Sequence, residues 1–307
     1  MSILVGENTH IIIQGMTGKM GRVHAKRTLE AGTNLLAGVT PGRGGEYVWD
    51  IPIYDHVSEA VQEHPQINAT MILTPPPAVL GAAIEAIEAG IKLIVIITEF
   101  VPVHDSLKIV KKAESLGAVV VGPNTIGVIS PGMSKIGVMP DYIYKKGHIG
   151  IVSRSGTLTH EVASNLTFAG FGQSSCLCIG GDAIGGLNHT KGLEFFKEDE
   201  DTAAVILIGE IGGTSEEDAA DYIRETGYQK PVFAYIAGVQ APVGKKMGHA
   251  GAIVSKGKGT ADSKIRKLQQ AGVKVAETTG RLLQLIREED ERQQHYLRTV
   301  EAICDID

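Results

Sequence analysis

Short apolar runs alternate with amphipathic stretches along the first part of the chain, and turn residues separate them. The runs are rich in Val, Ile and Leu and have the length of buried strands, while the amphipathic stretches have the period of helices. Strands alternating with helices are typical of a parallel, doubly wound α/β sheet, which binds ligands at the carboxyl ends of its strands. We expect strands at 10–14, 35–39, 69–73, 92–97 and 118–121, and helices that end near residues 31, 89 and 116, the last of them capped by Asp105.

The same alternation returns later in the chain and predicts a second doubly wound domain. Beyond Gly280 the sequence reads as a long polar helix, for which a solvated face is the default and a subunit contact the alternative. These patterns divide the chain into domains at 1–130 and 131–280 and a helical extension at 281–307. The expected strands of the second domain lie at 149–153, 174–179, 203–208, 232–236 and 273–275.

The composition excludes several classes of protein. The 307 residues are 43% hydrophobic and carry a net charge of −6, so the chain is globular and lacks the basic balance typical of nucleic-acid binding. Of three cysteines, Cys176 and Cys178 share one predicted strand, which indicates a reducing compartment and no paired zinc ligands. Met1–Leu4 has no signal-peptide pattern and no apolar run reaches membrane-spanning length, so we expect a cytoplasmic protein with no membrane or metal site.

The first strand leads into a glycine-rich turn, Gly15–Gly21, and then a helix. Such a turn lets backbone N–H groups and the helix N-terminus approach a phosphate, although a plain turn is the alternative. The second strand ends near Arg43 rather than at the acidic residue that would hold a ribose hydroxyl of NAD. Arg43 therefore suits a phosphorylated ribose or another phosphate, with a solvated loop charge as the alternative.

His249 stands between small residues, in the segment Met247–Ala252. An unshielded imidazole at neutral pH can attack an electrophile, whereas a solvent-facing loop histidine is the alternative. Glu210 follows the predicted strand at 203–208, between glycines, where a carboxylate can orient an imidazole, or can simply be solvated.

Two further segments bear on phosphate chemistry. Ser155–Gly156 lies at a strand-to-helix junction and does not match the hydrolase elbow, so we expect a phosphate cradle or an N-cap. The spacing from Gly238 to Lys246 does not match a P-loop. Two phosphate-type turns without a triphosphate motif suggest a phosphoryl carrier that obtains its phosphate elsewhere.

Eight short motifs in this order resemble the α subunit of succinyl-CoA synthetase (succinate–CoA ligase), over nearly the whole chain to about Ile286. The motifs are Gln14–Gly18, Gly38–Gly42, Ile97–Glu99, Gly122–Asn124, Ser153–Leu158, Ile179–Asp182, Gly209–Gly213 and Met247–Ala252. The resemblance implies a Rossmann-like CoA-binding domain followed by a flavodoxin-like ligase domain. It also implies a β subunit with an ATP-grasp fold, in an αβ or (αβ)₂ assembly, that supplies ATP or GTP with Mg²⁺.

The resemblance implies an enzyme of the tricarboxylic acid cycle that joins succinate to CoA through a phosphohistidine at His249. Glu210 would hydrogen-bond the histidine ring, and Ser155, Gly156 and Thr157 would receive the phosphate at a helix N-terminus. His160 would lie near the substrate dicarboxylate. The implied CoA site comprises Thr17, Gly18, Lys19, Met20, Arg43, Ile97, Thr98 and Glu99.

The chain departs from this family at three positions. Arg43 stands where the family usually has lysine, His160 where it usually has tyrosine, and Ala183 where it usually has proline. Because His160 would lie near the substrate, a malate– or citrate–CoA ligase subunit remains an alternative. A non-catalytic CoA-binding regulatory module is the other alternative, and an NAD-dependent dehydrogenase is disfavoured by Arg43.

Overall fold

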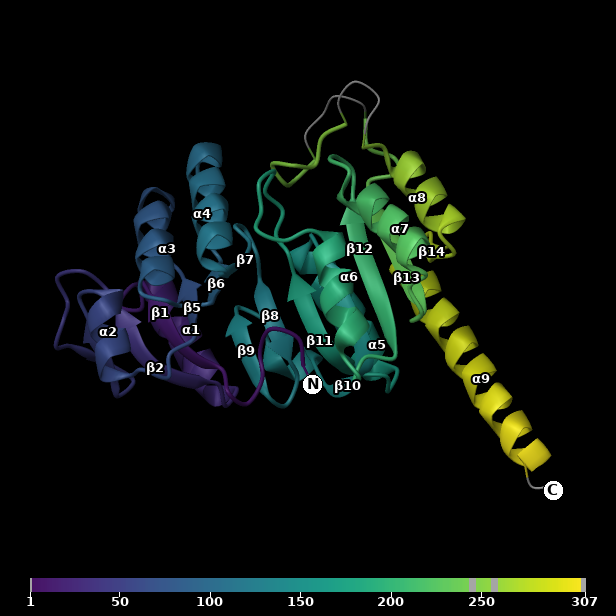
Figure 1. Ribbon diagram of the computed structural model, residues 1–307, viewed down its shortest axis with the longest axis horizontal. Coiled ribbons are helices and arrows are strands. Elements are labelled where there is room, and N and C mark those ends of the chain that lie inside the picture. The colour runs from purple at the N-terminus through teal and green to yellow at the C-terminus, as the bar shows by residue number, and fades with distance from the viewer. Residues whose placement is uncertain (1, 243–246, 255–258, 305–307) are drawn as a thin grey trace.

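The computed structural model describes residues 2–242, 247–254 and 259–304, with side chains described as far as residue 292. Within these residues the chain forms two seven-stranded sheets, one in each half of the chain (Figure 1). The first sheet has the order β3-β4-β2-β1-β5-β6-β7, and only the β3–β4 pair is antiparallel. Its strands are β1 (His10–Gln14), β2 (Asn34–Val39), β3 (Tyr47–Val48), β4 (Ile51–Tyr54), β5 (Ala69–Ile72), β6 (Leu93–Ile96) and β7 (Val119–Val121).

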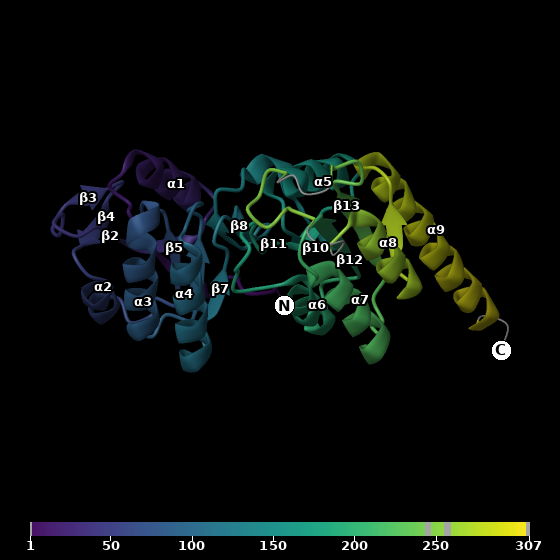
Figure 2. The same ribbon diagram turned by 90° about the horizontal axis from the view of Figure 1, so that it is seen from above.

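Helices cover both faces of the first sheet, because its central strand is apolar on both sides. Ile11 and Ile13 face the cluster that contains α1, whereas Ile12 faces the cluster that contains α2, α3 and α4. Figure 2 shows α1 on one side of the sheet and the other three on the opposite side. The helices are α1 (Lys19–Glu30), α2 (Val57–Glu63), α3 (Val79–Glu88) and α4 (Val103–Leu116), with a 3₁₀ turn η1 (Pro76–Ala78).

The second sheet has the order β14-β13-β12-β10-β11-β8-β9. Its parallel part runs from β14 to β11, and β8 and β9 add an antiparallel edge. Core residues of α5 and α9 pack on one face, and those of α6, α7 and α8 on the other. The strands are β8 (Gly127–Ser130), β9 (Ser134–Gly137), β10 (Lys146–Ser153), β11 (Gln173–Cys178), β12 (Ala204–Glu210), β13 (Val232–Ala237) and β14 (Lys274–Ala276).

As in the first half, helices connect the parallel strands of the second sheet. Helix α9 begins on the sheet and then projects beyond it (Figure 1). No helix in the described part of the chain combines the length and the apolar run that crossing a membrane takes. The helices are η2 (Asp141–Ile143), α5 (Gly156–Phe168), α6 (His189–Glu198), α7 (Ser215–Thr226), α8 (Ala261–Gln270) and α9 (Thr279–Cys304).

The predicted α/β class and the alternating order of elements are confirmed, and both buried cysteines are free thiols. Three details differ. The sequence reading missed β3, β4 and α2 in the first half and the β8–β9 hairpin at the start of the second. Helix α4 begins at Val103 after an N-cap at Pro102, so Asp105 lies in its first turn instead of capping it. Strand β12 continues two residues past its predicted end and includes Glu210.

The two sheets are joined by direct contacts as well as by the chain. Thr33 precedes β2, and its hydroxyl donates to the carbonyl of Lys135 on β9 at 3.1 Å and accepts from the backbone N–H of Lys135 at 2.9 Å. One hydrophobic cluster includes Val121 of the first sheet, Val128 of the second and Ile179, which directly follows β11. These contacts hold the two halves side by side.

The tight packing of α1 onto the glycine-rich turn yields a stability prediction. A Cβ at Gly21 would lie 2.2 Å from the carbonyl oxygen of Gly15, which is backbone and cannot move aside cheaply. Gly21→Ala should therefore destabilise the fold by about 1–3 kcal/mol, as overpacking does. Gly81→Ala on α3 is the matched control, because a Cβ there meets nothing within 4 Å and alanine favours a helix. Denaturant unfolding should separate the two; equal stability of both variants would contradict the packing argument.

Candidate active site

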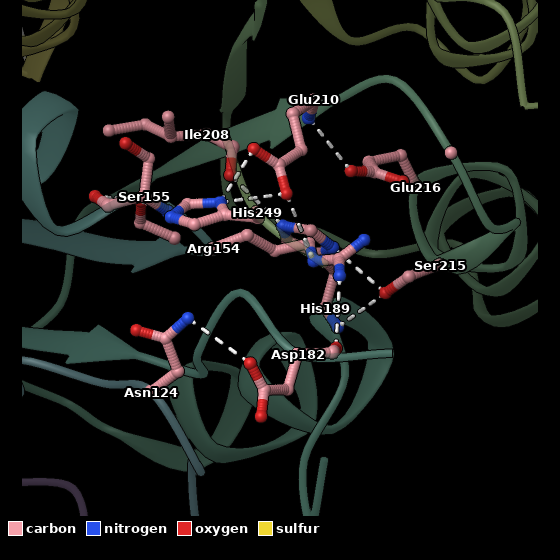
Figure 3. A network of polar contacts seen from close by, with 12 residues as sticks. Asn124, Arg154, Ser155, Asp182, His189, Ile208, Glu210, Ser215, Glu216 and His249 are labelled. Atoms are coloured by element: carbon pink, nitrogen blue, oxygen red, sulfur yellow. Dashed lines mark hydrogen bonds and ion pairs between the residues drawn. The ribbon is translucent and has the colours of Figure 1, made fainter. Parts of the chain in front are cut away.

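His249 is held by the carboxylate of Glu210, the last residue of β12 (Figure 3). Nδ1 of His249 lies 3.0 Å from Oε1 and 2.9 Å from Oε2 of Glu210. The Glu210 side chain is 10% exposed and the His249 side chain 28%. Because a carboxylate only accepts hydrogen bonds, Nδ1 carries the proton, and in the neutral ring the lone pair is on Nε2. The pair that the sequence suggested is therefore formed, and Glu210 is buried instead of solvated.

Glu210 also changes the basicity of the ring. Its hydrogen bond and its negative charge raise the pKa of His249 above the ordinary value, against the opposing effects of burial and of the Arg154 guanidinium. A carboxylate that stabilises the imidazolium form also stabilises the positive charge that develops when Nε2 forms a bond. The arrangement suits a nucleophilic histidine that becomes a covalent carrier.

The imidazole packs directly against the backbone of Gly181. A Cβ at Gly181 would lie 2.4 Å from Cγ of His249, so only glycine fits beneath the ring. A Cβ at Gly212 would lie 2.0 Å from the carbonyl oxygen of Gly251, and Gly212 has a φ of +89°. Glycines in two separate loops thus allow the histidine segment to sit close to the ends of β11 and β12.

Arg154 and Asp182, which were not predicted as site residues, complete the cluster. Nε of Arg154 lies 3.8 Å from Oε1 of Glu210, and its Nη2 donates to the carbonyl of Asp182 at 3.2 Å. The Asp182 carboxylate accepts from Nδ2 of Asn124 at 3.1 Å. The available signal for Arg154 was its position directly after a buried strand, where a parallel sheet collects ligand-binding groups.

A buried ion pair lies behind Glu210. Lys264 of α8 pairs with Glu216 of α7, and neither side chain is exposed. Oε1 of Glu216 accepts the backbone N–H of Glu210 at 3.0 Å, and Nζ of Lys264 donates to the carbonyl of Gly212 at 2.7 Å. Two helices far apart in sequence thereby fix the turn that carries Glu210. Sequence reasoning missed this pair, because charged residues in amphipathic helices are normally solvated.

The expected phosphate turn at Ser155, Gly156 and Thr157 forms the N-terminus of α5. Oγ of Ser155 accepts the backbone N–H of Leu158 at 3.3 Å, so the predicted N-cap is confirmed. In Figure 3 the imidazole of His249 lies between Glu210 and Ser155, with its second nitrogen on the Ser155 side. The helix N-terminus therefore lies on the side of the ring that Glu210 leaves free.

His160 lies one turn further along α5 and contacts Tyr144. The two side chains share a hydrogen bond of 2.8 Å between Nδ1 and the phenol oxygen. Burial lowers the pKa of His160, so its ring is neutral at physiological pH. The hydrogen bond fixes the orientation of the ring on the helix.

The residues expected to hold CoA lie along the carboxyl edge of the first sheet. Thr17, Gly18, Lys19 and Met20 surround the start of α1, and the Thr17 hydroxyl donates to that of Thr40 at 3.3 Å. Arg43 is about half exposed, and its Nε is 2.6 Å from Oε1 of Glu46. Any phosphate that binds Arg43 must compete with this surface ion pair.

Ile97, Thr98 and Glu99 follow β6 and connect this edge to the histidine. The Thr98 hydroxyl donates to the carbonyl of Thr74 at 2.7 Å. The backbone carbonyl of Thr98 accepts the backbone N–H of Asn124 at 3.0 Å. A cavity of about 320 Å³ opens beside them. Its lining includes Glu99 and Val103 from the first half and Asp182 and His249 from the second. Thr17 to Met20 and Arg43 do not line this cavity, so a ligand that contacts all of these residues must extend along the edge.

Two family models match the chain in the order of its two sheets. One, described as a CoA binding domain, matches residues 6–100, and the other, described as CoA-ligase, matches residues 152–274. The first model covers the residues expected to hold CoA. The second covers Arg154, Asp182, Glu210 and His249 and ends at the last strand of the second sheet. Fold and site therefore define the class: a CoA-ligase chain with a Rossmann-like and then a flavodoxin-like half.

Curated relatives narrow the class. The chain is 50% identical over 288 residues to succinate–CoA ligase (ADP-forming) subunit alpha 2 of Archaeoglobus fulgidus, covering 94% of this chain and 99% of the relative. It is 50% identical over 304 residues to the corresponding alpha subunit of Aquifex aeolicus, covering 95% and 98%. The chain belongs to the family of succinate–CoA ligase alpha subunits.

Solved structures share the fold at lower identity. An ATP citrate lyase of Methanosaeta concilii, in complex with (3S)-citryl-CoA, matches 94% of this chain with a TM-score of 0.86 and 23% identity. This chain spans 51% of that longer one. A dinucleotide-forming acetyl-coenzyme A synthetase of Candidatus Korarchaeum cryptofilum matches 88% of this chain with a TM-score of 0.70 and 21% identity, and this chain spans 58% of it. At these identities the comparison establishes the shared fold.

The contact between Glu210 and His249 predicts a change in the titration of the ring. Glu210→Gln removes the charge that stabilises imidazolium, so the pKa of His249 should fall, and the neutral ring should persist to lower pH. Imidazole ¹⁵N chemical shifts, followed against pH, measure this directly. Glu194→Gln, an exposed residue paired with Lys191, is the control and should leave His249 unchanged. An unaltered pKa in Glu210→Gln would contradict the assigned interaction.

Proposed function

We propose that this chain is the α subunit of an NDP-forming succinate–CoA ligase that works through a phosphohistidine at His249. The reaction is NTP + succinate + CoA = NDP + phosphate + succinyl-CoA. The observation that carries the proposal is the cavity lined by both Glu99, at the end of the CoA edge, and His249, whose Nδ1 is held by Glu210. The 50% identity to curated alpha subunits over nearly the whole chain supports the same reaction.

The reaction proceeds in three transfers. Nε2 of His249 attacks the terminal phosphorus of the nucleotide, and NDP leaves. A succinate carboxylate oxygen then attacks the phosphohistidine, so the P–N bond breaks and an acyl phosphate forms. The CoA thiol, losing its proton, attacks the acyl carbon, and phosphate leaves as the thioester forms. Splitting one condensation into these steps lowers each barrier.

Each neighbouring group has a distinct part in these steps. Glu210 keeps the proton on Nδ1 and stabilises the cationic phosphohistidine. The α5 N-terminus at Ser155, Gly156 and Thr157 offers backbone N–H groups and a positive dipole end to the phosphoryl oxygens. Arg154, whose Nε lies 3.8 Å from Oε1 of Glu210, places a positive charge on the other side of that carboxylate.

The CoA molecule is proposed to lie along the edge of the first sheet. The turn at Thr17, Gly18, Lys19 and Met20 would hold phosphate groups with backbone N–H groups. Arg43 would exchange Glu46 for a phosphate, and Ile97, Thr98 and Glu99 would guide the thiol arm to the cavity. This path joins all the expected CoA residues to the histidine with one extended ligand.

As an α subunit the chain works with a β subunit. We propose that the partner has an ATP-grasp fold and supplies ATP or GTP with Mg²⁺, in an αβ or (αβ)₂ assembly. We place the complex in the cytoplasm and in the tricarboxylic acid cycle. We also propose the division into domains at 1–130 and 131–280 with an extension at 281–307. The boundary near residue 130 is supported by β7 and β8, which lie on either side of residues 122–126 and belong to different sheets.

His160 supports a second candidate function, ligation of malate or citrate. A histidine held by Tyr144 on the phosphate-binding helix can donate an additional hydrogen bond that would suit a hydroxylated dicarboxylate or tricarboxylate. ATP citrate lyase of Methanosaeta concilii shares the fold over 94% of this chain, which makes the alternative structurally reasonable. Comparing His160→Tyr with wild type on succinate, malate and citrate separates the candidates.

Phosphoryl transfer to His249 is tested in the complex with the β subunit. Terminally labelled ATP or GTP should leave acid-labile, base-stable label on the wild-type α chain and none on His249→Asn, because asparagine cannot form the phosphoramidate. His148→Asn, an exposed histidine on β10, is the control and should be labelled normally. A wild-type complex that binds CoA yet takes up no label from either nucleotide would favour the non-catalytic CoA-binding module.

The role of Arg43 is tested by a CoA titration. Arg43→Gln should weaken CoA binding by about 1–2 kcal/mol, the size of a lost charge-assisted hydrogen bond at a partly exposed site. Arg224→Gln, which breaks a similar surface pair with Asp221, should leave the affinity unchanged. Calorimetry measures the CoA affinity of both variants. Equal affinities of Arg43→Gln and Arg224→Gln would mean that Arg43 does not reach the ligand.

A further inference from the structure

Phe100 has a backbone conformation that its side chain disfavours. It follows Glu99 directly and has a φ of +63°, in the left-handed region. Glycine and asparagine tolerate this region, whereas a bulky residue is rare there. Asn124, which lines the same cavity, also has a positive φ, of +57°, and is a residue type that suits it.

Packing within the chain does not compensate for this conformation. The Phe100 residue is 75% exposed, among the most exposed large hydrophobic residues of the described chain. Val103, on the same cavity wall, is 60% exposed. Exposed aromatic surface and backbone strain both oppose folding, so a glycine would serve the fold of this loop better. Strain that persists without internal packing points to a role in ligand binding.

The surroundings of Phe100 identify the kind of ligand. Phe100, Val101, Pro102 and Val103 are an apolar part of the lining of the 320 Å³ cavity, which the segments at 182–184 and 248–250 also line. The volume is at the lower end of the range for small-molecule sites. The lining thus combines apolar side chains with the imidazole of His249. A slender chain with aliphatic carbons and a reactive end fits this lining, and a nucleotide does not.

We propose that the Phe100 ring packs on the pantetheine arm of CoA and closes the cavity against water. This inference rests on the proposed function and adds a binding residue to it. When the ring holds the pantetheine arm in place, the thiol attacks the acyl phosphate. When the ring is removed, water attacks the acyl phosphate instead and yields the free acid and phosphate. The strained residue lines the cavity directly after Glu99, in the segment that follows β6.

The test uses Phe100→Gly and Phe100→Asn in the complex with the β subunit. Both residues accept a positive φ, so both variants should be at least as heat-stable as wild type. CoA affinity should fall about fivefold or more, as expected for losing roughly 1 kcal/mol of apolar contact. Phosphate released per thioester formed should rise above the wild-type ratio. Phe168→Ala, which removes an aromatic residue that is 87% exposed at the end of α5, is the control and should change neither quantity.

Three results would overturn the inference. Unchanged CoA affinity together with an unchanged phosphate-to-thioester ratio would mean that the ring does not meet the arm. Weaker association with the β subunit at unchanged CoA affinity would make Phe100 a partner contact instead. A fall in heat stability in both variants would mean that Phe100 supports the fold. CoA titrations of the wild-type complex and of the His249→Asn complex keep the two proposals apart. If CoA binds to neither complex, the proposed function itself fails.

Discussion

The bond between Glu210 and Nδ1 of His249 determines what the rest of the site can do. Both carboxylate oxygens lie within 3.0 Å of one ring nitrogen, so the ring cannot rotate without losing a charge-assisted hydrogen bond. Glu210 in turn is fixed by Glu216 and the buried Lys264. Removing one partner of such a pair typically costs about 3–5 kcal/mol, because the other charge is left uncompensated in the interior. The orientation of the reactive ring is therefore coupled to the stability of the domain.

The second constraint is the position of the seam between the two sheets. Asn124 bridges it: its N–H donates to the carbonyl of Thr98, and its own carbonyl accepts the N–H of Gly181, the residue beneath the imidazole. The cavity at this seam is lined from both halves of the chain. At this cavity a ligand bound along the first sheet can reach His249 of the second half. The site is thus a product of domain packing, and neither sheet contains it alone.

Much of the fold could be predicted from the sequence, because strand and helix periods are local properties. The apolar run at 10–14, the glycine-rich turn after it and the helix to residue 30 all form as expected. The missed elements are those with weak local signals. The strand at 127–130 and its hairpin partner at 134–137 are short, and each is stabilised by pairing with an antiparallel neighbour instead of by its own pattern. Pairing of that kind depends on the whole sheet.

For the site, the sequence by itself determined which residue types stand at strand ends and in glycine-rich loops. That was sufficient to single out His249 and Glu210, because parallel sheets collect such residues at one edge. Only the tertiary structure decided that these two residues, 39 positions apart, touch, and that Arg154 and Lys264 are buried beside them. It also decided that Phe100 is strained and faces the shared cavity. The physical reason is that backbone preferences act between near neighbours, whereas burial, pKa and cavity shape arise from residues that meet only when sheets and helices pack.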